Sequence, residues 1–272
     1  MTSRDLLRPG VDFSGTVVVV TGGARGVGRG VAEGFLEAGA HVVICGRNEP
    51  APEKLPHAGS RRAVFVRADV RVAEEAVSVV TATLATFGRL DVLVNNAGGS
   101  PAVPAADASP RFSSQVVVLN LLAPLQCAQA ANAVMRDQPE GGSIVNIASV
   151  SGLRPSPGTA AYGAAKAGLI NLTRSLAIEW APKVRVNCVV AGMVATEAAE
   201  DHYGGADNLA AVAATVPLGR MGTPADVAGA CLFLASPSLA SYVSGAALEV
   251  HGGGERPPFH DAVERRQESG GR

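Results

Sequence analysis

The sequence is poor in charged and aromatic residues, and it has no long apolar run. Charged residues make up 17% of its 272 residues and aromatic residues 4%, with one Trp. The formal net charge is −1 and no basic stripe is present, so nucleic acid is not expected as a partner. No apolar run approaches the ~20 residues that span a bilayer, and residues 1–13 lack the apolar stretch of a secretory signal. These absences favour a cytoplasmic protein without a membrane partner.

Cysteine is scarce as well. The four cysteines lie far apart, form no CxxC pair and each sit in an apolar segment: Cys45, Cys127, Cys188 and Cys231. Cysteines of this kind are typically small buried hydrophobes in a reducing compartment. We therefore expect four free, buried thiols and no metal site.

The sequence is rich in apolar residues and glycine. Hydrophobic residues make up 47% and there are 32 Gly, which suits a large core with many tight strand-to-helix turns. Short β-branched runs alternate with longer Ala-rich segments. The predicted strands are residues 16–21, 41–45, 63–67, 91–95, 143–148, 184–190 and 246–250. The predicted helices are residues 29–38, 72–87, 113–136, 160–180 and 223–235.

The predicted strands show no alternation of apolar and polar residues, so both of their faces should be buried. Together with the repeated strand–helix order, this predicts an α/β, doubly wound Rossmann fold with a parallel seven-stranded sheet in a three-layer α/β/α arrangement. We expect one such domain over residues 14–254, an N-terminal extension over residues 1–13, and a partly mobile C-terminal tail over residues 255–272.

Local signals refine this outline. Thr223, Pro224 and Asp226 form a helix start, with Thr223 as the cap. Pro124 predicts a bend within the long helix 113–136. The stretches that resemble linkers are residues 48–59, 99–109 and 195–208.

A glycine-rich loop follows the first predicted strand directly. Gly22, Gly26 and Gly28 have the spacing GxxxGxG, and a predicted helix comes next. Glycines let the backbone approach a pyrophosphate closely, and the helix offers unpaired N–H groups and a positive dipole end. The loop, with Val27 inside it, is therefore predicted to bind a dinucleotide.

The charges around this loop favour NADP(H) over NAD(H). NAD-binding proteins usually place an acid at the end of the second strand, where it holds the ribose 2′-OH. Here that strand ends with Gly46 and Arg47, without an acid, and Arg25 lies within the loop itself. Two guanidinium groups beside one ribose suit a 2′-phosphate. NAD(H) stays the alternative cofactor.

Tyr162 and Lys166 lie four residues apart on the predicted helix 160–180, which puts them on one face. A tyrosine hydroxyl normally ionises near pH ~10, and an ammonium held nearby would stabilise the phenolate and lower that pKa. Taken alone, this spacing is also common among ordinary surface residues.

The pair belongs to a series of residues that resembles the short-chain dehydrogenase/reductase family in its single-domain form. The likeness covers about residues 14–253. Its markers appear in order along the chain: Thr21-Gly22-xxx-Gly26-x-Gly28, Asp69-Val70, Asn95-Asn96-Ala97-Gly98, Asn120, Ser149, Tyr162-xxx-Lys166, and Asn187 ahead of Gly192. The resemblance implies an enzyme that moves hydride between NADP(H) and a carbonyl or secondary alcohol.

The resemblance also implies roles for four catalytic residues. Tyr162 would be the general acid for carbonyl reduction and the base for alcohol oxidation. Lys166 would lower the pKa of Tyr162 and bind the nicotinamide ribose. Ser149 would hold the substrate oxygen, and Asn120 would anchor a water in a proton relay to Lys166. Hydride transfer at carbon with proton movement at oxygen needs such groups.

Further cofactor contacts follow from the same resemblance. Asp69 would meet the adenine edge, with Val70 beside it. Asn96 would help to fix the ribose and the central sheet, and Ala97 and Gly98 would leave room for the cofactor.

Two more contacts are implied for the segment after the sixth predicted strand. Val194 and Thr196 lie where the family contacts the nicotinamide carboxamide. The chain departs from the family's pattern just before them, since Ala191 and Gly192 stand in place of Pro-Gly. The resemblance therefore does not predict the path of this loop.

The substrate and the assembly are less defined. Candidate substrates are a 3-oxoacyl thioester, a steroid-like or cyclic ketone, and a small alcohol. Residues 195–218 are expected to form a substrate lid, and their lack of Lys and Arg favours an apolar substrate. The Ala- and Gly-rich face around Tyr162 predicts a homo-oligomer, a tetramer or a dimer. A non-catalytic NADP-binding scaffold is the competing class, although Tyr162, Lys166 and Ser149 are all present.

Overall fold

The computed structural model describes residues 11–197, 199 and 205–254. The expected C-terminal tail, residues 255–272, and most of the expected N-terminal extension, residues 1–10, lie outside the described residues. Phe13, which the sequence analysis assigned to the extension, is buried against Phe35 with the ring centroids 5.0 Å apart. The packed core thus includes residue 13.

Seven parallel strands form one sheet in the order β5-β2-β1-β6-β7-β8-β9, which confirms the predicted doubly wound α/β fold. The strands are β1 Val17–Thr21, β2 His41–Gly46, β5 Val64–Arg67, β6 Val92–Asn95, β7 Gly142–Ser149, β8 Val184–Ala191 and β9 Ala247–Val250. Each predicted strand agrees with one of these to within one residue at either end. The strands that follow β1 in the sequence lie first on one side of it (β2, β5) and then on the other (β6 to β9). The connecting helices therefore cover both faces of the sheet.

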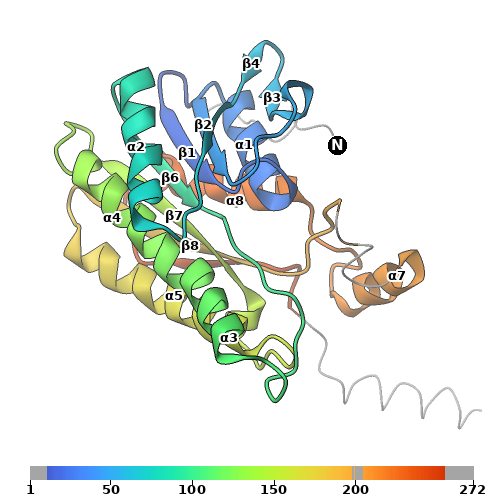
Figure 1. Cartoon of the computed structure of the whole chain (residues 1–272). Coiled ribbons are helices and arrows are strands. Elements are labelled where there is room, and N and C mark those ends of the chain that lie inside the picture. The colour runs from blue at the N-terminus through green and yellow to red at the C-terminus, as the bar shows by residue number, and fades with distance from the viewer. Residues whose placement is uncertain (1–10, 198, 200–204, 255–272) are drawn as a thin grey trace, which may run out of the picture.

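Helices form the outer two layers (Figure 1). α1 (Gly26–Glu37) and α8 (Pro224–Ala235) pack together on one face. The other face is covered by α2 (Ala73–Phe87), α4 (Ala123–Met135) and α5 (Ala160–Glu179). All five residues of β1 are buried. Burial on both faces explains why these strands lack the alternation of a half-exposed strand.

The predicted helix 113–136 is interrupted rather than simply bent. α3 (Pro110–Val117) and α4 flank a stretch of π-helix, η3 (Val118–Leu122), in which the N–H of Ala123 donates to the carbonyl of Val118 five residues back. Pro124 follows at once and has no N–H, so it cannot donate to the carbonyl of Asn120. Asn120 lies inside this π-turn with its side chain fully buried. Such π-bulges often mark functional sites.

The helical run Pro110–Met135 is long and apolar enough to cross a membrane by composition alone. In the fold it packs as a core element. Ala123, Cys127, Ala128 and Ala131 are buried in one cluster with residues of α2 and of the sheet. These contacts pack the α4 part of the run into the core of the domain.

The cysteines are free and buried, as the sequence predicts. Burial raises the pKa of Cys45 and of Cys188 to about 11, because a thiolate loses its hydration inside the core. Among the described residues, no group of three or more His, Cys, Asp or Glu side chains is placed to hold a metal ion.

Short elements occur in or beside stretches that the sequence analysis treated as linkers. β3 (His57–Ala58), within the expected linker 48–59, forms an antiparallel hairpin with β4 (Arg61–Arg62), which follows that linker. α7 (Ala206–Thr215) begins inside the predicted linker 195–208, so the expected substrate lid contains a helix. The predicted start of α8 is confirmed, since the side chains and backbone N–H groups of Thr223 and Asp226 form a reciprocal capping box.

Candidate active site

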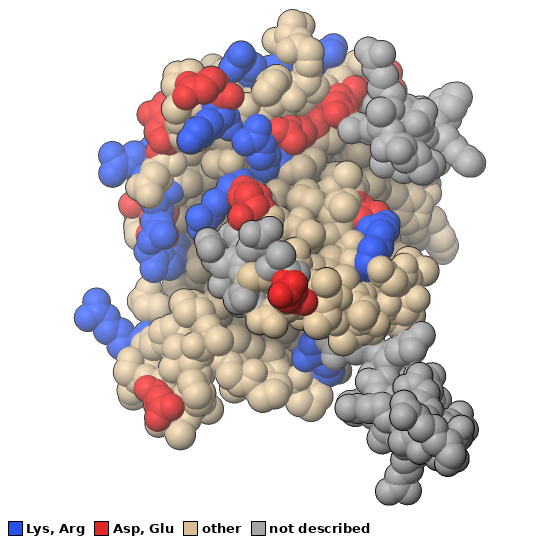
Figure 2. Space-filling model, turned by 90° about the vertical axis from the view of Figure 1, so that its right-hand side faces the viewer, with Lys and Arg blue, Asp and Glu red and all other residues tan. Residues whose placement is uncertain are grey.

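The carboxyl ends of the parallel strands meet along one edge of the sheet, which faces the viewer in Figure 2. Open α/β sheets bind their ligands in the crevice beyond this edge. The residues singled out from the sequence follow the edge from β5 to β8: Asp69 and Val70, Arg47, residues 22–28, residues 96–98, Ser149, and Val194 with Thr196. The fold therefore brings segments from across the chain to one line.

The glycine loop turns sharply between β1 and α1. Gly22 and Gly26 have φ angles of 65° and 55°, in the left-handed region that favours glycine. Gly28 packs against the protein itself, since a Cβ there would lie 2.3 Å from Nδ2 of Asn96 and 2.4 Å from the carbonyl oxygen of Gly22. Val27 packs against the core on the α1 face. Gly28 thus lets the amino end of α1 approach the loop after β6 closely.

Thr21 and Asn96 join the glycine loop to the loop after β6. Oγ1 of Thr21 accepts hydrogen bonds from the N–H groups of Asn96 and Ala97, at 3.0 and 2.9 Å. In return, Nδ2 of Asn96 donates to the carbonyls of Thr21 and Gly22, at 2.9 and 3.3 Å. The amide that the sequence analysis assigned to the ribose is thus used inside the protein, and Thr21 is a further positioning residue. The ribose contact of Asn96 stays a prediction.

The amino end of α1 is not capped by its sequence neighbours. Arg25 is the N-cap residue, and its side chain makes no capping hydrogen bond. The first turn of the helix contains no acidic residue. Instead, the N–H of Gly26 donates to Oε1 of Glu197 at 2.8 Å. Sequence reasoning missed Glu197, because 171 positions separate it from its partner.

Arginines follow two of the strands and lie in the glycine loop. Arg47 comes directly after β2 and Arg25 lies in the glycine loop, and both are exposed; Arg67, at the end of β5, pairs across the ladder with Gly46. Figure 2 shows Lys and Arg side chains gathered toward the upper left of this face. Gly46 carries no side chain, and a Cβ on it would meet only the ring of Phe65, at 3.7 Å. The end of β2 itself therefore carries an arginine and no acid, and Gly46 adds no side chain there.

Asp69 is held by Arg71. Oδ1 of Asp69 accepts from Nε of Arg71 at 2.9 Å, and Oδ2 accepts from Nη2 at 2.5 Å. These bonds hold the pKa of Asp69 below its usual range, and the charge of Arg47 acts in the same direction. Val70 faces inward and is buried beneath α2. The adenine contacts of Asp69 and Val70 stay predictions, and Arg71 is a charged neighbour that sequence reasoning missed.

α5 carries Tyr162 and Lys166 on one face, as their spacing predicts. Nζ of Lys166 lies 5.6 Å from the centroid of the Tyr162 ring, within the range of a cation–π interaction. The Lys166 side chain is only 3% exposed, and its Nζ donates to the carbonyl of Ile147 at 2.7 Å. Burial lowers the pKa of Lys166 to about 8, because the ammonium loses its hydration.

Asn120 holds the loop after β6 next to this lysine. Its Nδ2 donates to the carbonyl of Gly99 and its Oδ1 accepts from the N–H of Gly99, both at 2.9 Å. A Cβ on Gly98 would lie 2.7 Å from Oδ1 of Asn120 and 3.3 Å from Nζ of Lys166. Gly98 is therefore the residue that lets backbone, amide and ammonium come together. The structure places three of the predicted site residues in one cluster here.

Ser149 reaches the same neighbourhood from the end of β7. Its Oγ accepts from the N–H of Ser151 at 3.2 Å, within the 3-10 turn η4 (Val150–Gly152). That turn packs on α5: a Cβ on Gly152 would lie 3.1 Å from Cβ of Lys166, and one on Gly163 would lie 2.8 Å from the carbonyl oxygen of Ser151. The turn thus seats Ser149 beside the Tyr162–Lys166 face of the helix.

The segment after β8 crosses to the glycine loop. Ala191, in place of the family's proline, completes β8 and pairs with Ser149 on one side and Val250 on the other. Val194 pairs with Gly222 in a parallel bridge. Thr196 lies against the glycine loop, because a Cβ on Gly26 would be 3.5 Å from Cγ2 of Thr196. The loop therefore passes over the amino end of α1.

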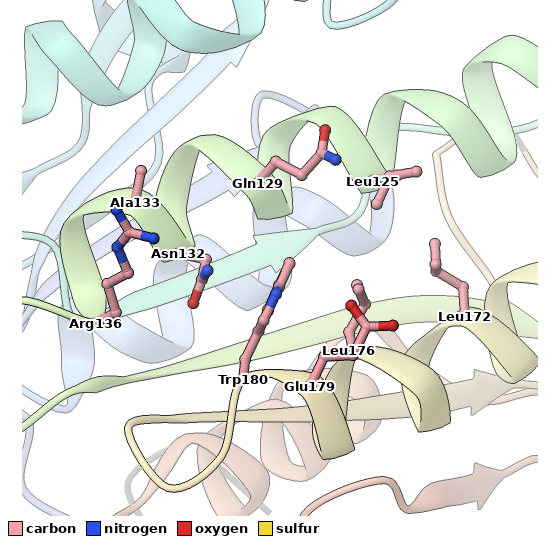
Figure 3. A pocket seen from close by; sticks show the side chains of 9 residues that line it. All are labelled: Leu125, Gln129, Asn132, Ala133, Arg136, Leu172, Leu176, Glu179 and Trp180. Atoms are coloured by element: carbon pink, nitrogen blue, oxygen red, sulfur yellow. The ribbon is translucent and has the colours of Figure 1, made fainter.

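Hollows of two kinds lie on the described part of the chain, one near the predicted site and one away from it. A cavity of about 80 Å³ lies beside Tyr162 and is lined by Val103 and Phe112 among others. A larger groove of about 370 Å³ lies between α4 and α5, where Asn132 and Trp180 point toward one another (Figure 3). The groove is lined by other residues than the predicted site, so it is a separate feature of the surface.

Comparison with known proteins finds matches among oxidoreductases. Residues 22–255 match the family described as enoyl-(acyl carrier protein) reductase. A 3-oxoacyl-(acyl-carrier-protein) reductase of Chlamydia muridarum (strain MoPn / Nigg) is 40% identical over 243 residues, which cover 86% of this chain and 95% of that protein. An L-fucose dehydrogenase of Oryctolagus cuniculus is 38% identical over 252 residues, covering 90% and 87%.

A solved structure is similar over its whole length. It is that of a protein assigned as a short-chain alcohol dehydrogenase from Sinorhizobium meliloti 1021, with a TM-score of 0.84 and 37% identity. The alignment covers 90% of this chain and 98% of that one. The seven-stranded parallel sheet with helices on both faces agrees with this structural likeness. The chain belongs to the short-chain dehydrogenase/reductase family of oxidoreductases, whose members bind a nicotinamide cofactor and act on small molecules.

Proposed function

We propose that the protein interconverts a carbonyl compound and a secondary alcohol with NADP(H), using Tyr162 as the proton donor and acceptor. One observation supports this most directly. A buried ammonium, that of Lys166, lies under the ring of a half-buried tyrosine at the carboxyl edge of the sheet. A cation so close to the ring favours the phenolate form that proton transfer requires.

Different residues of the chain donate the proton, hold the substrate oxygen and restore the proton. NADP(H), when bound, would supply the hydride for the carbonyl carbon or take it back from the alcohol. In reduction, the hydroxyl of Tyr162 gives its proton to the carbonyl oxygen, while the hydroxyl of Ser149 holds that oxygen in place. Lys166 stabilises the resulting phenolate. Asn120 anchors a water through which Tyr162 regains a proton by way of Lys166.

The residues after β2 and in the glycine loop fit the 2′-phosphate of NADP(H). Arg47 follows β2, Arg25 lies in the loop, both are exposed, and Gly46 adds no side chain beside them. Guanidinium groups form paired hydrogen bonds with phosphate oxygens, whereas the 2′-OH of NAD(H) needs a carboxylate. The glycine loop and the amino end of α1 would hold the pyrophosphate of either cofactor.

The walls of the crevice suit an apolar, uncharged substrate. Leu153 is 50% exposed beside the Ser149 turn, and Leu218 is 71% exposed at the end of the expected lid. The cavity beside Tyr162 is lined by apolar and hydroxyl side chains. Among the candidates, a 3-oxoacyl thioester or a cyclic ketone would bury these surfaces better than a small alcohol would.

We also propose a cytoplasmic homo-oligomer, a tetramer with a dimer as the alternative. Ile178 on α5 is 81% exposed, and the adjacent groove between α4 and α5 contains Trp180 and Leu172 (Figure 3). A second copy of the chain would cover this apolar surface. The small residues around Tyr162 serve partly within the chain, since Gly168 packs against Leu121.

The test is an activity screen of the purified protein. Ketones of the three substrate classes are offered with NADPH and with NADH, and cofactor oxidation is followed by absorbance. The proposal expects turnover with NADPH that exceeds turnover with NADH for at least one ketone. Binding of NADPH without turnover of any ketone or alcohol would instead support a non-catalytic scaffold.

A further inference from the structure

The side chain of Glu197 lies on the amino end of α1. Its Oε1 accepts the N–H of Gly26, the first residue of this helix, at 2.8 Å. Neither the N-cap side chain nor an acid in the first turn offers α1 another negative partner. Glu197 is therefore the anion that satisfies the positive end of the helix.

The charges around Glu197 strengthen this contact. Hydrogen bonds from its own backbone N–H and from that of Gly26 hold the pKa of Glu197 below its usual range, and the charges of Arg29 and Arg25 act in the same direction. The carboxylate is thus ionised at neutral pH. It accepts from the N–H of Gly26, which an anionic ligand of the glycine loop would also use, and it feels the charge of Arg25 in the same loop.

We propose that the Glu197 carboxylate competes with the pyrophosphate of the cofactor for the amino end of α1, and so limits how tightly and how long the dinucleotide is held. The inference rests on the proposed function, because it needs the pyrophosphate to bind at this loop. A pyrophosphate carries two negative charges, and an N–H donor given to Glu197 is not available to it. Cofactor binding therefore requires the carboxylate to leave.

The position of Glu197 makes this exchange simple. Its side chain is exposed, so a change of side-chain torsions alone would move the carboxylate into water. The backbone just before it is fixed, since Val194 pairs with Gly222 and the N–H of Ala195 donates to the carbonyl of Gly222 at 2.8 Å. The carboxylate would return to Gly26 each time the cofactor departs.

A purely structural role for Glu197 gives the opposite expectation. If the carboxylate only capped α1 and stayed in place with the cofactor bound, its removal would loosen the helix start and weaken both folding and binding. Competition instead predicts that the variant without cofactor is less stable but binds the dinucleotide more tightly. The sign of the change in affinity separates the two roles.

The experiment compares the wild type with Glu197→Gln, and with Glu33→Gln as the control. Glu33 lies within α1, and its carboxylate pairs with Arg29 rather than with an N–H group of the helix start. Dissociation constants are measured for NADPH, NADH and adenosine 2′-phosphate, which lacks the pyrophosphate. Melting temperatures are measured without ligand, and dissociation rates of NADPH by stopped flow.

Glu197→Gln should bind NADPH and NADH about threefold to tenfold more tightly, by the usual size of a charge effect at a helix end, and release them more slowly. Adenosine 2′-phosphate should gain less affinity than the dinucleotides, because it lacks the pyrophosphate and Glu197 reaches its site only through the charge of Arg25. The melting temperature without ligand should fall. If Glu197→Gln binds the dinucleotides as tightly as the wild type or more weakly, the competing role of Glu197 is wrong, while the proposed function is unaffected. Failure of the wild type to bind either dinucleotide would overturn the proposed function as well.

Discussion

The ammonium of Lys166 and the main-chain carbonyl of Ile147 are joined by a 2.7 Å hydrogen bond. The bond ties α5 to β7 two residues before Ser149, at the carboxyl edge of the sheet. The carbonyl oxygen of Ile147 is a neutral partner for the buried ammonium. Gly98 and Asn120 lie close to the same ammonium. This cation is the feature on which the first prediction depends.

Replacing Lys166 should change how the stability of the cofactor-free protein depends on pH. The folded-state pKa of about 8 is below the ordinary 10.5, so between these values the unfolded chain keeps a proton that the folded chain releases. Stability therefore rises with pH in this window. Relative to Lys166→Met, the wild type should gain on the order of 2 kcal/mol between pH 8 and pH 10. Urea unfolding at several pH values measures this, and a constant difference would argue against the buried charge.

Arg47→Asp should weaken NADPH binding by about tenfold to a hundredfold while changing NADH binding much less, since only NADPH has a 2′-phosphate to lose a charged partner. Arg61→Asp makes the same charge change on the exposed hairpin strand β4 and serves as the control. Fluorescence titration gives the dissociation constants of both cofactors for the wild type and the two variants. Equal losses for both cofactors would remove Arg47 from the 2′-phosphate site.

Two buried asparagines should behave differently when replaced. Asn120→Ala and Asn187→Ala should each lower the free energy of unfolding by on the order of 2 kcal/mol, because each leaves backbone groups unpaired. Asn187 bonds to Val243 and Ala246 between β8 and β9, so its variant should keep turnover. Asn120 holds Gly99 in the site, so its variant should also lose turnover. Loss of activity in both variants to the same extent would point to stability alone.

Two glycines in helices offer a matched steric test. Gly28→Ala should impair cofactor binding and stability, because its Cβ would lie 2.3 Å from Asn96. Gly229→Ala, on the exposed side of α8 with no atom within 4 Å, should stabilise the protein by about 0.5–1 kcal/mol through helix propensity. Thermal melts and NADPH titration check both variants. Normal binding by Gly28→Ala would show that the loop is looser than its contacts indicate.

The sheet could be predicted from the sequence because its strands are buried on both faces and separated by clear helical segments. β1 is four valines and a threonine, and a run this short, rich in β-branched residues and followed by glycines, favours a strand. The hairpin of β3 and β4 could not be predicted, since each strand has two residues and no apolar pattern. α7 was missed because Ala-rich sequence beside glycines also suits a lid or linker.

The candidate site could be predicted only where a motif marks it. Tyr162 and Lys166 are one turn apart on one helix, so their spacing is visible in the sequence. The bonds of Thr21 to the loop after β6 and of Glu197 to Gly26 join segments far apart in the chain. No local pattern encodes such contacts. They follow from strand order and loop path, which only the folded structure shows.

The most direct measurement is a single turnover of NADPH by Tyr162→Phe with a ketone that the wild type reduces. Removing one hydroxyl leaves the ring and its packing beside Lys166 in place. NADPH should bind as tightly as to the wild type, while the rate of its oxidation should fall by about a hundredfold or more, as expected for loss of a general acid. Oxidation at a near-normal rate would mean that another group supplies the proton, and would contradict the assignment of Tyr162.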